Sequence, residues 1–154
     1  MTPGELARQH SRVGLDANVL IYLFEDDGPR GRKAGALLDA IELGSIHGVL
    51  ATIGLSEILT GPARRGDLAA LERGADEIRS TPGISLQRLT AEIAIDAAVI
   101  RGARAIALID AIHLASARAA GATAFVTNDR RVRSAPNLEV VYLDDLEVGE
   151  EPAA

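Results

Sequence analysis

Four acidic residues stand where structural elements of this 154-residue chain are expected to meet. They are Asp16, Glu57, Asp110 and Asp129. Carboxylate oxygens are the ligands that Mg²⁺ and Mn²⁺ prefer in proteins, and four carboxylates carry about the charge that two divalent ions neutralise. These residue types indicate a divalent-metal site, provided that the fold brings the four side chains together.

Two of the acids are associated with short apolar strands. Asp16 directly follows the apolar residues 13–15, and an apolar helix is predicted just beyond it. Residues 47–53 predict a second strand, and the next helix carries Glu57 about one turn inside it. Both acids are therefore expected near the carboxyl end of a strand.

The other two acids are joined by one helix and one strand. Asp110 opens a helix predicted over residues 111–120, Gly121 ends it, and Asp129 closes a strand predicted over residues 123–127. About ten helical residues advance about 15 Å and about five strand residues return about 17 Å, so the two carboxylates can lie side by side. Alternating strands and helices imply parallel strands, whose carboxyl ends form one edge. We expect all four acids in one pocket there.

The remaining elements are expected to form the scaffold. They are helices over residues 32–43, 67–80 and 91–104, and short strands over residues 84–86 and 139–143. Gly61-Pro62 is predicted to end the helix of Glu57, because proline has no amide hydrogen to donate. The length fits one domain over residues 1–146, followed by an acidic tail, residues 147–154, that we expect to be disordered.

Composition excludes several kinds of site. The chain contains no cysteine, which excludes disulfides, thiolate catalysis and cysteine-bound metals. No apolar run approaches the ~20 residues that span a bilayer, and the N-terminus has no signal-peptide character. We therefore expect a cytoplasmic protein without membrane contact, whose metal would be held by oxygen or by a few histidine nitrogens.

Charge is unevenly distributed along the chain. The net charge is −6, yet the last sixteen residues hold six of the 22 acids and no base, so the rest of the chain is formally neutral. Three arginines follow the last of the four candidate acids: Arg130, Arg131 and Arg133. They are candidates for phosphate contacts with RNA, and solvated surface arginines are the alternative.

Three segments carry a resemblance to a known family. Residues 15–22, 110–117 and 126–129 look like the successive motifs of PIN-domain ribonucleases, and the nearest likeness is to VapC-type toxins of type II toxin–antitoxin systems. The likeness covers residues 12–142, with Glu57 in the place of the family's second acid. It implies a three-layer α/β/α fold with a mainly parallel central sheet, Mg²⁺ or Mn²⁺ dependence and RNA hydrolysis. It also implies an antitoxin that covers the site, and a homodimer.

Each candidate residue also has a structural interpretation. We predict that the four acids bind metal and catalyse hydrolysis, although any one of them alone could be a helix cap or a solvated carboxylate. Asn18 and Thr127 are predicted to orient carboxylates or metal-bound water, with a simple helix cap as the alternative for Asn18. His113 lies one turn after Asp110 and could face the pocket, but a packed or hydrogen-bonded histidine is favoured over a catalytic one.

Four other functions are alternatives to a toxin ribonuclease. A stand-alone RNA-processing PIN nuclease and a catalytically degenerate PIN binding protein both remain open. A receiver-type phosphoacceptor requires a lysine at a late strand end, whereas Lys33 lies in an early helix. A haloacid-dehalogenase-like phosphatase requires a second Asp two residues after its nucleophile, where this chain has Asn18. Single residues therefore disfavour the last two classes.

Overall fold

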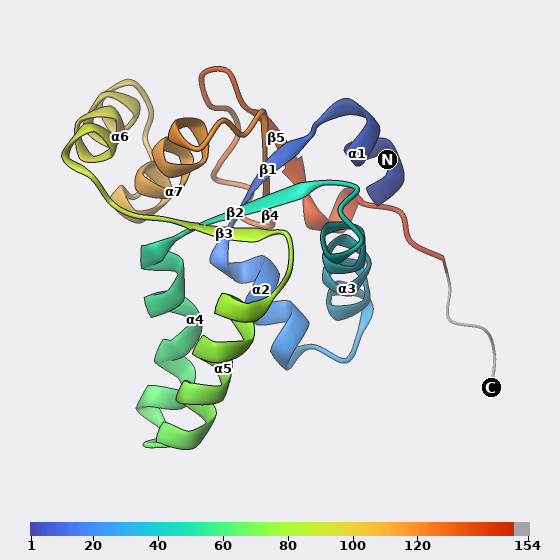
Figure 1. The fold of residues 1–154 in the computed structure, drawn as a ribbon. Coiled ribbons are helices and arrows are strands. Elements are labelled where there is room, and N and C mark those ends of the chain that lie inside the picture. The colour runs from blue at the N-terminus through green and yellow to red at the C-terminus, as the bar shows by residue number, and fades with distance from the viewer. Residues whose placement is uncertain (150–154) are drawn as a thin grey trace.

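The computed structural model describes residues 1–149. Its centre is a five-stranded, fully parallel sheet with the strand order β3-β2-β1-β4-β5 (Figure 1). The strands are β1 Arg12–Leu15, β2 His47–Ala51, β3 Ile84–Gln87, β4 Ala124–Thr127 and β5 Glu139–Tyr142. The helices are α1 Pro3–Gln9, α2 Ala17–Glu25, α3 Pro29–Glu42, α4 Thr52–Arg64, α5 Leu68–Ser80, α6 Ala91–Ala103 and α7 Leu108–Ala119, with a short 3-10 helix, η1 Leu143–Asp145.

Helices cover both faces of the sheet, so the molecule has three layers (Figure 1). One apolar core joins α1, α2 and α3 to strand residues such as Leu15, Leu50 and Val126. A second core joins α6 and α7 to the opposite face, where Phe125 is fully buried. Val126 and its neighbour Phe125 point to opposite faces because side chains alternate along a strand. The predicted three-layer α/β/α fold is confirmed.

A glycine lets α7 approach β1 closely. A Cβ atom at Gly14 would lie only 2.5 Å from the Cβ of Ala117 and 2.8 Å from the Phe125 ring. No real Cβ contact is that short, so only glycine fits under the helix at this point. The close approach fixes α7, which carries Asp110 and His113, against the strand that ends at Asp16.

Several helix boundaries differ from the sequence prediction, and α3, for example, begins at Pro29 and not at residue 32. The prediction that Gly61-Pro62 ends the helix of Glu57 is wrong, because α4 continues through Pro62 to Arg64. Proline in the last turn removes only one backbone hydrogen bond, and packing of α4 against α5 offsets that loss. Helix α7 begins at Leu108, so Asp110 is the third helical residue and does not open the helix.

The ends of the described chain are tied together. A capping box between Thr2 and Glu5 begins α1, and the Glu147 amide donates to the Met1 carbonyl at 2.9 Å. Most of the predicted disordered tail, from residue 150 onward, lies outside the described residues. Within residues 1–149, no helix has both the length and the apolar character that a membrane crossing requires.

Candidate metal centre

Asp16 lies at the carboxyl edge of the sheet, directly after its central strand, β1. Strands β1 and β4 pair directly, with Leu15 opposite Val126, so the residues that follow them, Asp16 and Thr127, become neighbours. The Thr127 hydroxyl donates to Asp16 Oδ2 at 2.7 Å, and both residues are buried. Asp16 occupies the cap position before α2, yet its side chain makes no capping bond. Its carboxylate therefore remains directed to the interior of the site.

Glu57 and His113 meet beside Asp16. Glu57 lies on α4, and its Oε1 atom is 2.5 Å from His113 Nε2 on α7. One ligand atom from each of Asp16, Glu57 and His113 lies within 4.8 Å of the other two. Two carboxylate oxygens and one imidazole nitrogen at this spacing can hold a divalent ion. This group is the candidate metal centre.

Asp110 and Asp129 lie outside this tight group. Burial raises the pKa of Asp110, and the charges of Asp16 and Asp129 raise it further, so Asp110 shares the electrostatic field of the centre. Asp129 follows β4 by two residues, and its amide donates to the Thr127 hydroxyl at 3.0 Å. Its carboxylate forms an ion pair with Arg131 at 2.8 Å, and this hydrogen-bonded contact lowers its pKa.

The buried charges of the centre balance one another. Burial raises the pKa of Asp16, while His113 and the Thr127 hydroxyl act in the opposite direction. Burial alone would lower the pKa of His113, but its hydrogen bond to Glu57 and the charge of Asp16 outweigh burial and raise that pKa. The contacts of His113 with Glu57 and Asp16 therefore favour its positively charged form, and a divalent ion would also supply positive charge beside these carboxylates.

A buried oxygen without a partner supports the same interpretation. Among the described residues, Asn18 Oδ1 is buried and accepts no hydrogen bond. A buried acceptor normally has a donor, and water bound to a metal would supply one. Asn18 is not the helix cap considered from the sequence, because Asp16 holds the cap position of α2. The donor set and this orphaned oxygen fit Mg²⁺ or Mn²⁺.

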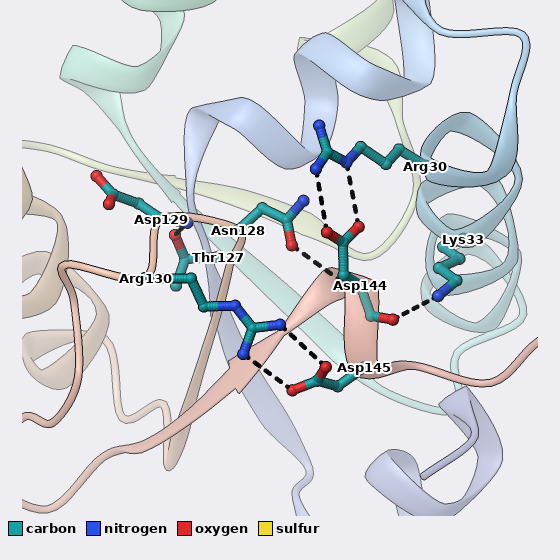
Figure 2. Close-up of polar contacts among 8 residues, drawn as sticks. All are labelled: Arg30, Lys33, Thr127, Asn128, Asp129, Arg130, Asp144 and Asp145. Atoms are coloured by element: carbon teal, nitrogen blue, oxygen red, sulfur yellow. Dashed lines mark hydrogen bonds and ion pairs between the residues drawn. The ribbon is translucent and has the colours of Figure 1, made fainter.

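The loop after β4 is held from its far side by η1. Asn128 Oδ1 accepts a hydrogen bond from the Asp144 amide at 3.0 Å (Figure 2). The Asp144 carboxylate in turn pairs with Arg30 at 3.1 Å, and Lys33 donates to the Asp144 carbonyl. The loop directs Asp129 away from η1 (Figure 2). These contacts fix the backbone between Thr127 and Asp129.

The three predicted RNA-contacting arginines have different surroundings. Arg130 pairs with Asp145 at 3.0 Å and stacks over the Tyr142 ring, with its guanidinium carbon 4.0 Å from the ring centre. Arg131 pairs with Asp129. Arg133 is exposed and forms no ion pair with any residue among 1–149. Arg130 and Arg131 are therefore each held by a carboxylate, and all three arginines remain candidates for substrate contact.

His113 is the residue that the sequence left outside the ligand set. The expected hydrogen-bonded histidine is present, since Nε2 contacts Glu57, but this contact lies inside the candidate centre. A single histidine on an apolar helix face is usually part of a packed core, so the sequence alone favours a structural role for His113 over metal binding. The signal in its favour was its position one turn after Asp110 on the same helix.

Comparisons with known proteins agree with the fold. A chain of the VapBC2 complex from Rickettsia felis, solved with a DNA fragment from its promoter, superposes with a TM-score of 0.69 at 17% identity, covering 85% of this chain and 98% of that one. A chain of a toxin–antitoxin complex from Klebsiella pneumoniae superposes with a TM-score of 0.63 at 20% identity, covering 82% of this chain and 94% of that one. VapC20 from Mycobacterium tuberculosis, a sarcin-ricin loop cleaving toxin, superposes with a TM-score of 0.56 at 19% identity. The match covers 73% of this chain and 86% of that one.

At these identities the superpositions establish the fold alone. A comparison with curated protein sequences found no match. The sequence profile of the PIN domain matches residues 13–138, which is most of the chain and includes Asp16, Glu57, Asp110 and Asp129. This chain is therefore a member of the PIN domain family.

Proposed function

We propose that this protein is a metal-dependent ribonuclease and the toxin of a type II toxin–antitoxin pair. The observation that carries the proposal is the group of Asp16, Glu57 and His113, whose ligand atoms lie within 4.8 Å of one another at the carboxyl edge of the sheet. Asp110 shares the field of this group. Clustered carboxylates on a PIN fold suit the binding of a divalent ion and the hydrolysis of a phosphodiester.

The residues of the centre have separate roles in this proposal. Asp16 and Glu57 would hold Mg²⁺ or Mn²⁺, and the ion would supply Lewis-acid polarisation of the phosphate and of a water molecule. His113 orients Glu57, and Thr127 orients Asp16, through the hydrogen bonds described above. Asp110 and Asp129 complete the set of predicted catalytic acids.

Hydrolysis joins the oxygen of water to the phosphorus atom and breaks the opposite bond to a ribose oxygen. The water loses a proton to a basic group in the site, and the leaving ribose oxygen gains one.

The partners follow from the same proposal. The two toxin–antitoxin complexes that superpose on this chain support an antitoxin as its protein partner. The cleavage described for VapC20 supports RNA as its substrate. A second copy of the chain is a further predicted partner, and the exposed apolar side chains Ile95 and Val99 on α6 offer a surface for it. A toxin of this kind would act in the cytoplasm.

A cleavage assay tests the nuclease. Purified protein is incubated with structured and single-stranded RNAs in the presence of Mg²⁺ or Mn²⁺, and a parallel reaction contains EDTA. The proposal expects cleavage that EDTA abolishes. Cleavage that persists in EDTA would contradict metal dependence, and intact RNA in every reaction would contradict the nuclease.

A growth assay separates a toxin from a stand-alone nuclease. Induced expression of the chain should arrest bacterial growth, and co-expression of a small gene from immediately upstream should restore it. Growth that continues normally while the purified protein cleaves RNA would support the stand-alone nuclease instead.

A further inference from the structure

A groove of about 450 Å³ opens next to Asp129, whose ion-pair partner Arg131 lines it. The turn between α6 and α7 and the loop after β4 form it, with Arg104, Ala105, Ile106, Arg131, Arg133 and Ser134 as its lining. Arg131 also forms the ion pair with Asp129, so the groove adjoins one of the predicted catalytic acids. Three of the six lining residues are arginines, which makes this surface cationic in a chain whose net charge is −6.

Of the three arginines in the groove, Arg131 is paired with Asp129, and the other two have no such partner among the described residues. Within residues 1–149, neither Arg104 nor Arg133 forms an ion pair, and the only side chain that Arg104 hydrogen-bonds is Ser134, at 3.5 Å. Arg130, by contrast, is held by Asp145 just outside the groove. The groove therefore presents guanidinium groups that are available to an external anion.

We propose that this groove binds the phosphate backbone of the RNA strand that leads to the candidate metal centre. The inference rests on the proposed function and adds the place where the substrate is held. Guanidinium groups bind phosphate oxygens through paired hydrogen bonds, and the Ser134 hydroxyl can donate one more. No aromatic residue lines the groove, so binding depends on the backbone charge and not on base stacking.

The positive charge of the groove would also reduce the electrostatic repulsion between the RNA phosphates and the carboxylates of the site. A phosphodiester must approach carboxylates of its own sign, which opposes binding unless positive charge lies close by. Arg131 contacts Asp129 and lines the groove, so it lies at the boundary between the acids and the bound strand. Arg104 and Arg133 extend the positive charge away from that boundary.

The test measures RNA binding with cleavage switched off. A fluorescent single-stranded RNA is titrated with the Asp16→Asn protein in EDTA, and anisotropy gives the dissociation constant between about 50 and 200 mM salt. The double variant Arg104→Ala/Arg133→Ala is compared with the control Arg64→Ala, whose exposed arginine lies at the far end of α4. Melting temperatures confirm that each variant is folded.

Each arginine removed should weaken binding about threefold at low salt and reduce the slope of log K against log salt by about 0.7. Arg64→Ala should change neither quantity. Equal dissociation constants for the double variant and the Arg64→Ala control would contradict RNA binding in the groove. An Asp16→Asn protein that binds no RNA would contradict it as well. Failure of the nuclease itself would be recognised separately, as wild-type protein that leaves RNA intact with Mn²⁺.

Discussion

Glu57 and His113 come from helices on opposite sides of the sheet and meet at its carboxyl edge, with Oε1 and Nε2 2.5 Å apart. The His113 side chain is only 1% exposed, and its Nδ1 atom has no partner among the described residues. This contact connects the core to the candidate metal centre, because His113 packs in the interior and holds a predicted ligand.

Replacing His113 with alanine should therefore affect both stability and metal binding. Loss of a buried ring and of its hydrogen bond should lower the free energy of unfolding by about 2–4 kcal/mol. Urea denaturation in EDTA measures this change, and Mn²⁺ titration by calorimetry should show weaker binding. His113→Gln, which keeps a donor for Glu57, serves as the comparison. Mn²⁺ affinity that equals the wild-type value in both variants would exclude His113 from the centre.

Asp110→Asn should stabilise the metal-free protein. The pKa of Asp110 is raised above its ordinary value of 3.8 by burial and by Asp16 and Asp129. The folded state thus holds its proton more tightly than the unfolded chain, so stability is lost as the pH rises from about 4 through the raised pKa. The variant should melt at a higher temperature than the wild type at pH 7 in EDTA, with a smaller decline between pH 4 and pH 7. A lower melting temperature of the variant at pH 7 would contradict a raised pKa of Asp110.

Mn²⁺ should stabilise the folded protein, because a bound ion relieves repulsion among the clustered carboxylates. At a free concentration 100 times the dissociation constant, the stabilisation is about 2.7 kcal/mol. Differential scanning fluorimetry with Mn²⁺ and with EDTA measures the shift, and Asp16→Asn should reduce it. An unchanged wild-type melting temperature at saturating Mn²⁺ would count against the site.

Arg131→Gln should increase the affinity for Mn²⁺. Arg131 forms its ion pair with Asp129 and so competes with a metal ion for a predicted ligand. Arg133→Gln is the matched control, since it removes an equal charge nearby without breaking that pair. Calorimetry should show a larger gain in affinity for Arg131→Gln than for Arg133→Gln. An equal response in the two variants would indicate only a general effect of charge.

The sheet was the part of the fold that the sequence predicted best. Short apolar runs ending in turn residues locate the strands to within one or two residues, as with β4, expected from residue 123 and observed from Ala124. Asp16 and Thr127 become neighbours simply because β1 and β4 pair in parallel. Local periodicity was sufficient to locate the strands, whereas the pairing of β1 with β4 was not predicted from the sequence.

Helix starts and side-chain partners were harder to predict. Aspartate is a common N-terminal cap, so the sequence predicts that Asp110 begins a helix. The N-terminal cap of α7 is instead Ala107, which has no capping side chain. The pairing of Asp129 with Arg131 and the groove that joins Arg104 to Arg133 depend on the packed structure. No sequence spacing encodes such contacts between distant segments.

The most direct test of the metal-dependent nuclease compares the initial rates of RNA cleavage by the wild type, Asp16→Asn and Asp76→Asn at saturating Mn²⁺. Asp16 is buried within the ligand group, whereas Asp76 is an exposed residue of α5. Asparagine keeps the size of the side chain and removes the charge, so both variants should fold. We predict that Asp16→Asn abolishes cleavage and that Asp76→Asn retains the wild-type rate. Wild-type cleavage by folded Asp16→Asn would contradict the proposed site.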